Sequence, residues 1–303
     1  MAKPRLLNMN GAIIPYEDAR VHVLSTAMKY AASVYEAMRA YWSDADQQLY
    51  VFRLREHLRR LERSAKIARI PLPADAARFE REVLDVIRAN DLHEDLHVRQ
   101  IVFVDTDDGG LASREPVGYV IAPIPTTRYF ESAGLHVSSW HRTADNAIPA
   151  RVKAAANYQN SRLALLQAKT DGYDDAIMIN SDGSVAEGPG YTLFLVRDDQ
   201  PMTPSVTSNI LEGVTRSTLL TLFSESLGVT VEQREIDRTE LYVADEAFFA
   251  GTAAEVTPIL SVDRRPVGEG VMGPLTAKVR DAYFRAVRDG SAPHPDWRTP
   301  VYR

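Results

Sequence analysis

The change of hydrophobic period between neighbouring segments constrains the fold of this 303-residue chain most strongly. Residues 48–52 (QLYVF) are typical of a strand, and after Arg53 the apolar residues follow the spacing of one helix face, at Leu54, Leu58, Leu61 and Ala65. The second half alternates in the same way, with helices predicted at 157–169, 213–227 and 274–287 and strands at 175–180, 191–196 and 246–250. Since helices and strands mix in both halves, we expect α/β or α+β domains.

Turn residues divide the remaining segments. Asn10-Gly11 before residues 12–15 predicts an opening hairpin. Two strand-like runs, 97–105 and 117–122, flank the turn-prone DTDDGG, and residues 122–134, which hold two prolines, are typical of a linker. At about 150 residues per domain, the length suggests two domains. We therefore expect a smaller N-terminal domain (1–123), an interdomain loop (124–134) and a larger C-terminal domain (135–303), with a ligand cleft between them.

Composition excludes several classes of protein. The chain has no cysteine, which excludes disulfide scaffolds, Cys-ligated metal centres and Cys nucleophiles. Seven scattered histidines show no metal-ligand spacing, so we expect no metal site. We find neither a run of about 18 apolar residues nor the apolar core of a signal peptide in MAKPRLLNMNG. With a net charge of −6, we expect a cytoplasmic protein that binds neither membranes nor nucleic acid.

Two ionisable residues stand in unusual local sequences. Lys153 precedes three alanines in IPARVKAAANY, and small residues allow a ligand to approach closely. An amine in a partly desolvated pocket loses its proton more easily and attacks carbonyls; a surface lysine at a helix start is the alternative. Glu187 precedes Gly-Pro-Gly, which predicts a sharp turn. Its carboxylate is suited to a heterocycle nitrogen, and a plain turn residue is the alternative.

Three segments are suited to binding an anion. Gly213 and Thr215 in LEGVTRSTL open a predicted helix whose first N–H groups attract anions, although an ordinary N-cap explains them too. Thr252 in AGTAAE follows a predicted strand, where a plain turn is the alternative. Arg60 lies beside the apolar helix stripe and is expected to point inward as a phosphate clamp, whereas Arg53 and Arg59 are expected on the solvated face.

Taken in order, these blocks resemble the fold-type IV pyridoxal-phosphate aminotransferases, above all the branched-chain amino acid aminotransferases. Nearly the whole chain carries the resemblance, in residues 17–41, 51–67, 137–158, 185–190, 211–216, 241–259 and 267–276. It implies a two-domain α/β (α+β) fold and a pyridoxal 5'-phosphate cofactor. By resemblance, Lys153 forms the Schiff base and moves the proton, Glu187 pairs with the pyridine nitrogen, and Tyr158 bonds the 3-oxygen. The implied phosphate ligands are Arg60, Val214, Thr215 and Thr252.

The resemblance also implies a substrate pocket. The residues that match its positions are Tyr30, Tyr35, Arg39, His97, Arg99, Tyr129, Thr252 and Ala253. Arg99 is the implied partner of the side-chain carboxylate of glutamate. The chain departs from the family at His97, where tyrosine is usual, at Thr126, where tryptophan is usual, and at Ala37, where glycine is usual. Tyr191-Thr192 also replaces a common Glu-Asn. These departures concern the substrate more than the cofactor.

The implied activity is transfer of the amino group of branched-chain or other apolar L-amino acids to 2-oxoglutarate, by a ping-pong mechanism. An (R)-amine or D-amino acid transaminase of the same fold type is an alternative, which the Gly-Pro-Gly also suggests, and so is a lyase acting on aminodeoxychorismate. A binding protein without cofactor chemistry is a third. The resemblance implies a homodimer, and we expect the loop 105–110 to complete the neighbour's pocket.

Overall fold

The computed structural model describes residues 3–126, 131–289 and 293–302. The chain divides into two compact units. The first contains the described residues of 1–127, 152–156 and 286–303, and the second contains those of 128–151 and 157–285. Each unit combines one sheet with helices, as the alternating periods predicted.

The first unit is built on a seven-stranded sheet in the order β15-β4-β3-β5-β6-β1-β2, in which every neighbouring pair is antiparallel. Its strands are β1 (Leu6–Met9), β2 (Ala12–Pro15), β3 (Ser33–Ser43), β4 (Gln48–Phe52), β5 (Leu96–Val104), β6 (Val117–Pro125) and β15 (Arg298–Pro300). Asn10 and Gly11 have φ angles of 55° and 88°, so they form the predicted tight turn between β1 and β2.

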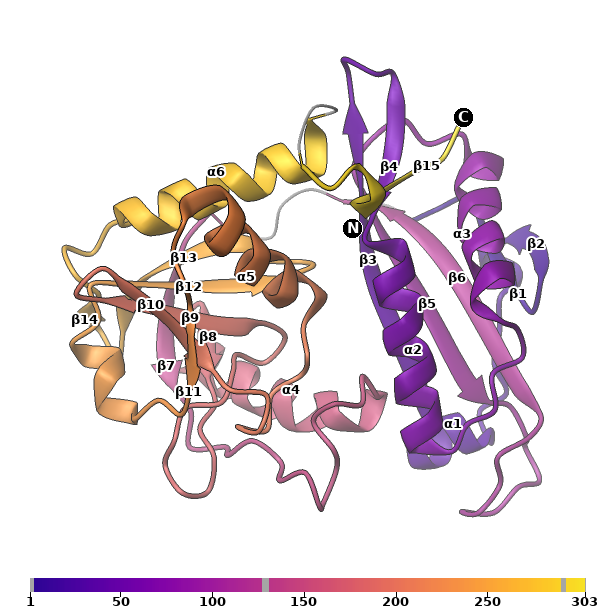
Figure 1. Cartoon of the computed structure of the whole chain (residues 1–303). Helices are drawn as coiled ribbons and strands as arrows, with labels where there is room; N and C mark the ends of the chain where they lie inside the picture. The colour runs from indigo at the N-terminus through magenta and orange to yellow at the C-terminus, as the bar shows by residue number, and fades with distance from the viewer. Residues whose placement is uncertain (1–2, 127–130, 290–292, 303) are drawn as a thin grey trace. The chain divides into compact units, whose positions relative to one another are not determined.

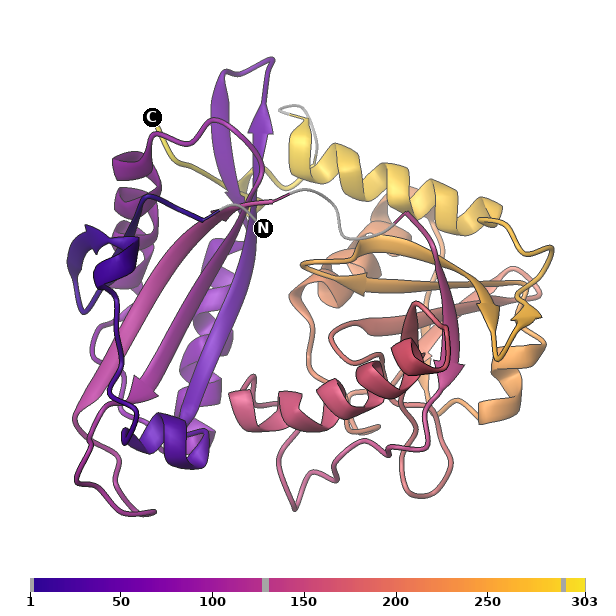
Figure 2. The same cartoon turned by 180° about the vertical axis from the view of Figure 1, so that it is seen from behind.

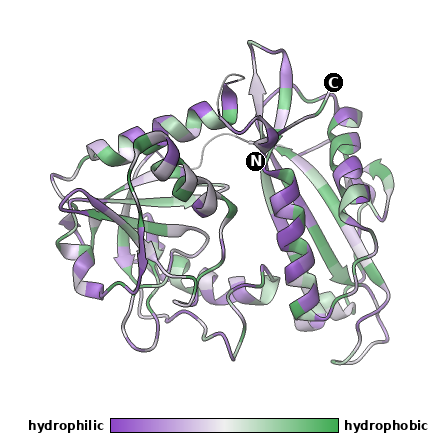
Figure 3. Cartoon of the chain, viewed as in Figure 1, coloured by the Kyte–Doolittle hydropathy of each residue, from purple (hydrophilic) through white to green (hydrophobic). Residues whose placement is uncertain are grey.

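Helices α2 (Leu54–Ala68) and α3 (Ala76–Asn90) cover one face of this sheet, and the view from behind places the strands in front of α2 (Figures 1 and 2). Leu54, Leu58 and Leu61 of the predicted stripe are buried in the core. The visible side of α2 is mainly hydrophilic, whereas β5 and β6 are mainly apolar (Figure 3). Amphipathic packing therefore orients α2. The short helices of this unit are η1 (Tyr16–Asp18), α1 (Thr26–Tyr30) and η3 (Pro295–Trp297).

The end of the chain corrects two predictions. Residues 298–300 were expected in the C-terminal domain, but β15 pairs with β4 in the first sheet. Arg53 was expected on a solvated helix face, but it is buried, with its guanidinium carbon 4.5 Å from the centroid of the Trp297 ring and its backbone N–H donating to the Trp297 carbonyl at 2.7 Å. Local periodicity could not show either contact, because the partners are more than 240 residues apart in the sequence.

The expected linker is shorter than the proline pattern suggested. Strand β6 continues through Pro125, and the next strand, β7, begins at Ala133. Pro123 and Pro125 therefore stand within a strand, although prolines are usually typical of loops. The proposed cleft between the domains stays a prediction.

The second unit contains an eight-stranded sheet. Seven strands follow the order β11-β10-β9-β12-β13-β7-β8, and β14 pairs with β13. The strands are β7 (Ala133–Val137), β8 (Asp175–Ile177), β9 (Thr192–Arg197), β10 (Gln200–Pro204), β11 (Glu232–Arg234), β12 (Glu246–Gly251), β13 (Glu255–Val262) and β14 (Arg265–Pro266). The helices associated with it are α4 (Ala155–Thr170), α5 (Val214–Leu227), η2 (Arg238–Tyr242) and α6 (Pro274–Arg288). The first two residues of α4 and the last three of α6 belong to the first unit.

Alternation along β9 gives this sheet two apolar faces. Leu193 and Leu195 belong to the main core cluster of the unit. Phe194, on the opposite face, stacks on Phe248 of β12 with ring centroids 5.0 Å apart and on Phe223 of α5. Both faces are therefore packed, which explains the continuous apolar run in the sequence. Among the described helices, none is long and apolar enough to cross a membrane.

Candidate functional site

Lys153 belongs to the first unit, where β3 and α2 hold its backbone. Its N–H donates to Ser64 Oγ at 3.1 Å, and its carbonyl accepts the N–H of Tyr35 at 2.9 Å. The side chain is buried, only 8% of the residue being exposed, and Nζ lies 4.8 Å from the centroid of the Tyr35 ring. These contacts contradict the alternative of a surface lysine. They place an amine in a largely desolvated setting, as nucleophilic chemistry requires.

Four of the predicted substrate residues share one face of the first sheet. Cross-strand pairing sets Arg39 opposite His97 and Ala37 opposite Arg99. Side chains alternate along strands, and Val34, Met38 and Val98 point into the core on the α2 side. The opposite face therefore carries Tyr35, Arg39, His97 and Arg99. The guanidinium carbon of Arg99 lies 5.6 Å from the Tyr35 ring centroid, so this group adjoins the ring that contacts Lys153.

His97 is the polar residue of this face with the most perturbed titration. Burial lowers its pKa to about 3, and the positive charges of Arg99 and Arg39 act in the same direction. The imidazole is therefore neutral near pH 7. Neither ring nitrogen has a hydrogen-bond partner among the described residues. A neutral ring carries one donor and one acceptor, which makes His97 suitable for contact with a polar substrate group.

Arg60 points inward, as predicted, and Arg59 is exposed. No sequence pattern indicated the partner of Arg60, which is the fully buried Glu36 of β3. Nε of Arg60 donates to Oε1 at 2.7 Å and Nη2 donates to Oε2 at 2.8 Å, while His57 Nδ1 lies 2.7 Å from Oε2. Arg60 is thus a rigid cation held from behind by a carboxylate.

The structure places two other predicted pocket residues differently. Tyr30 ends α1 and is 47% exposed, so it is not buried with the group on the sheet face. Tyr129 lies outside the described residues. Thr126 is partly buried, and its N–H donates to the carbonyl of Asp95 at 3.1 Å.

Glu187 belongs to the second unit and is buried at the predicted sharp turn. Its carbonyl accepts the N–H of Met178 at 2.9 Å, and the following Gly188 donates to the carbonyl of Tyr191 at 2.8 Å. A Cβ at Gly188 would lie 2.7 Å from a ring carbon of Phe249, so the turn requires glycine here. The Gly-Pro-Gly pattern therefore reported a real steric constraint.

The carboxylate of Glu187 has two partners in the second unit. Arg142 Nη2 lies 2.8 Å from Oε1, and the N–H of Leu211 donates to both oxygens at 3.2 Å. A guanidinium and an amide N–H both stabilise the ionised form. Arg142 was missed because the loop that contains it has no periodic signal. The arrangement presents a buried, charged carboxylate, the group required opposite a protonated heterocycle.

The predicted anion site at the start of α5 is also recognisable. Gly213 precedes the helix without a side-chain cap, and Val214 and Thr215 are its first two residues. The first N–H groups of a helix have no partner within it, and the helix dipole makes this end positive. A Cβ at Gly213 would lie 3.2 Å from Thr192 Oγ1, so glycine allows close packing.

Thr192 also connects this helix start to β12, because it pairs with Ala250. Just beyond Ala250, Thr252 and Ala253 form the partly buried turn between β12 and β13. The structure thereby brings the start of α5 and the AGTAAE segment to neighbouring positions in the second unit. Tyr158, in the first turns of α4, is partly buried. In the part of the chain that the structure describes, no group of three acidic or histidine side chains is arranged to hold a metal ion.

Comparison with known proteins assigns these features to one family. The family described as Amino-transferase class IV matches residues 33–262. A relative named probable branched-chain-amino-acid aminotransferase, from Aquifex aeolicus (strain VF5), is 39% identical over 296 residues, which cover 96% of this chain and 95% of that protein. The crystal structure of a branched-chain aminotransferase from Thermoproteus uzoniensis with norvaline matches with a TM-score of 0.94 and 39% identity, covering 99% and 100% of the two chains.

A third comparison concerns ligands. A branched-chain amino acid aminotransferase from T.th., solved in complex with N-(5'-phosphopyridoxyl)-L-glutamate, matches with a TM-score of 0.92 and 36% identity. The alignment covers 99% of this chain and 100% of that one. In that relative, the bound molecule joins a pyridoxyl phosphate to glutamate.

Proposed function

The chain belongs to the class IV aminotransferase family, and from this membership we propose that it transfers the amino group of branched-chain amino acids with pyridoxal 5'-phosphate as its cofactor. We further propose 2-oxoglutarate as the acceptor and a ping-pong order. The observation that carries the proposal is the burial of Lys153 beside Tyr35, with its backbone held by β3 and α2. Such an amine is the group that an aldehyde cofactor requires.

The residues present fit the chemical parts of this cofactor. Lys153 offers an amine for the aldehyde, and Glu187, kept ionised beside Arg142, offers a carboxylate for the ring nitrogen. Val214 and Thr215 at the start of α5, together with Thr252 and Arg60, offer donors for the phosphate. When bound, the cofactor withdraws electrons from the Cα of the amino acid, which weakens the bond from Cα to hydrogen.

Each side chain then has a defined task. Lys153 takes the proton from Cα and returns it, because its amine is the base anchored beside the reacting group. Glu187 holds a proton on the ring nitrogen, since a charged carboxylate favours the protonated ring. Tyr158 donates to the 3-oxygen of the ring. These assignments follow the family positions, and the buried amine of Lys153 and the charged carboxylate of Glu187 support them.

The sheet face of Tyr35, Arg39, His97 and Arg99 supports recognition of two kinds of substrate. The Tyr35 ring offers apolar surface to a branched side chain, whereas Arg99 offers a guanidinium to the distal carboxylate of glutamate. Thr252 and Ala253 would hold the α-carboxylate. The relative from T.th. that binds a glutamate adduct is consistent with the second kind.

We also propose a homodimer. The residues 21–30 and the loop 105–111 lie together in the first unit, since Thr26 N–H donates to the Thr106 carbonyl at 2.9 Å and Lys29 Nζ to the Gly109 carbonyl at 2.8 Å. This joined surface exposes Val23, Leu24, Met28 and Leu111, each more than half exposed. Exposed apolar patches are typical of association surfaces. Sedimentation should give twice the chain mass, and a species of single mass would contradict the proposal.

Cofactor half-reactions test the proposed activity. Purified enzyme is mixed separately with L-leucine, D-alanine and (R)-1-phenylethylamine, and the visible absorbance of the bound cofactor is followed. We expect L-leucine to convert the cofactor and 2-oxoglutarate to restore it. Conversion by the amine alone would favour the (R)-amine transaminase, and a protein that stays colourless with added pyridoxal phosphate would contradict the cofactor assignment. Lys153→Ala should abolish both the band and turnover.

A further inference from the structure

Glu36 is a carboxylate at a position where the strand otherwise carries apolar residues. Val34, Met38 and Ala40 of β3 alternate with their neighbours and point into the core formed with α2. Glu36 shares that face and is 0% exposed. A charge buried in such a place costs several kcal/mol unless it is paired and fully hydrogen-bonded. The residue therefore needs a reason beyond packing.

The partners of Glu36 keep it ionised. Burial would raise the pKa of Glu36, but the Arg60 guanidinium and the His57 ring outweigh this and hold the pKa below its usual range. Burial lowers the pKa of His57, against the opposing charge of Glu36. His57 is therefore neutral, and because an ionised carboxylate only accepts, Nδ1–H of His57 donates to Glu36. The three side chains form one bidentate ion pair with a supporting donor.

This pairing fixes the direction of Arg60. A guanidinium is planar, so two parallel hydrogen bonds to one carboxylate determine the plane and orientation of the whole group. His57 and Arg60 are three residues apart on α2, and both meet the same carboxylate from β3. Glu36 therefore locks a helix side chain to a strand. It does so where Ser64 of α2 and Tyr35 of β3 hold the backbone of Lys153.

We propose that Glu36 is a positioning residue for the cofactor phosphate, which it serves by orienting the Arg60 guanidinium, with His57 as its supporting donor. The inference rests on the proposed function, because it takes Arg60 as a phosphate ligand. It assigns roles to Glu36 and His57, which touch neither substrate nor cofactor. Orientation, rather than added charge, is the contribution, since Glu36 neutralises the cation that it holds.

A comparison of two ligands tests this role. Pyridoxal 5'-phosphate and pyridoxal differ only in the phosphate, and both are titrated into the apo form of the full chain while the visible absorbance is followed. For Glu36→Gln, we expect the dissociation constant of pyridoxal phosphate to rise about tenfold or more, the equivalent of one charge-assisted hydrogen bond, with little change for pyridoxal. An amide offers one acceptor oxygen and cannot receive both Arg60 bonds.

Controls separate orientation from general damage. Met38→Leu changes the same face of the same strand without a polar contact, so it should leave the ratio of the two dissociation constants unchanged. If Glu36→Gln does not fold, Glu36→Asp decides, because the shorter carboxylate keeps its charge but cannot span both Arg60 nitrogens. In an Arg60→Lys background, either Glu36 variant should have little further effect on the ratio.

The failures are distinguishable. A wild-type chain that binds neither ligand would overturn the proposed function itself. A wild-type chain that prefers pyridoxal phosphate, with Glu36 variants that lose affinity for both ligands equally or for neither, would overturn only the positioning role.

Discussion

The backbone N–H of Lys153 donates to the hydroxyl of Ser64, a residue of α2 with no exposed surface. The helix thereby holds the position of the proposed nucleophile directly. Ser64→Ala would leave this N–H without that acceptor in a buried place, which costs about 1–3 kcal/mol. We expect the free energy of unfolding to fall by that amount and the fraction of bound cofactor to fall with it, as measured by urea denaturation and visible absorbance.

A matched control is available in α5. Ser224 is an exposed serine within a helix, so Ser224→Ala should change the free energy of unfolding by less than about 0.5 kcal/mol. If Ser64→Ala were as harmless as Ser224→Ala, the hydroxyl would not be holding Lys153.

The chemistry-bearing residues with strong local patterns were predictable from the sequence. Lys153 before three alanines, Glu187 before Gly-Pro-Gly and Gly213 at a helix start were all recognisable, and the structure shows a buried amine, a turn carboxylate and a helix start there. Each depends on neighbours within a few residues. Whether these residues perform the roles that the family implies stays a prediction.

The partners of these residues were not predictable, because they come from distant segments. Arg142 reaches Glu187 across 45 positions, and Glu36 reaches Arg60 across 24. Strand β3 was itself missed, because it is buried along both faces and carries charged residues inward, so apolar and polar residues do not alternate along it. Patterns of period predict an element only where one face meets water.

Glu187 should be required as a charged group. Glu187→Gln keeps the shape and one acceptor oxygen but removes the charge that would hold a proton on the cofactor nitrogen. We expect kcat to fall by about 100-fold or more, with the protein still able to bind pyridoxal phosphate. Steady-state kinetics with L-leucine and 2-oxoglutarate measure this. Glu187→Asp retains the charge and should keep more activity; equal losses in the two variants would contradict a role for charge.

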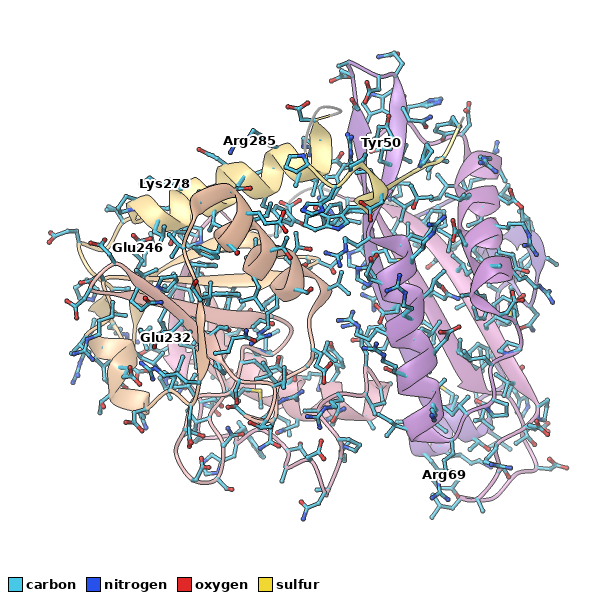
Figure 4. The ribbon with its side chains drawn as sticks, in the orientation of Figure 1. Tyr50, Arg69, Glu232, Glu246, Lys278 and Arg285 are labelled. Carbon is cyan, nitrogen blue, oxygen red and sulfur yellow. The ribbon has the colours of Figure 1, made fainter. Side chains whose placement is uncertain are left out.

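The start of α6 depends on a carboxylate from β12. Oε1 of Glu246, labelled in Figure 4, accepts the N–H of Leu275 at 2.9 Å, and Oε2 accepts that of Thr276 at 2.7 Å. A Cβ at Gly273 would lie 2.2 Å from Glu246 Cγ. Gly273→Ala must therefore displace the carboxylate, and we expect a loss of about 2 kcal/mol in unfolding free energy. Gly110→Ala, where no atom lies within 4 Å of the added Cβ, is the control and should be nearly neutral.

Asp175 of β8 should make stability depend on pH. It is 2% exposed, and burial raises its pKa from 3.8 to about 6, although the N–H of Ala176 donates to it. Between about pH 4 and pH 6 the folded chain therefore binds more protons at this site than the unfolded chain. The contribution of Asp175 to the free energy of unfolding falls as pH rises through this window, by up to about 3 kcal/mol, and is constant above it.

Asp175→Asn tests this directly, because the amide oxygen still accepts from Ala176 but carries no charge. We expect the variant to be more stable than the wild-type chain at pH 8, by about 1–3 kcal/mol, and to match it near pH 4. Urea denaturation across this range measures the difference. Asp199→Asn, an exposed carboxylate between β9 and β10, should shift stability little at any pH. A constant difference between Asp175→Asn and wild type from pH 4 to pH 8 would show that the effect is not titration of this carboxyl, because only a raised pKa makes the gap widen as pH rises through 6.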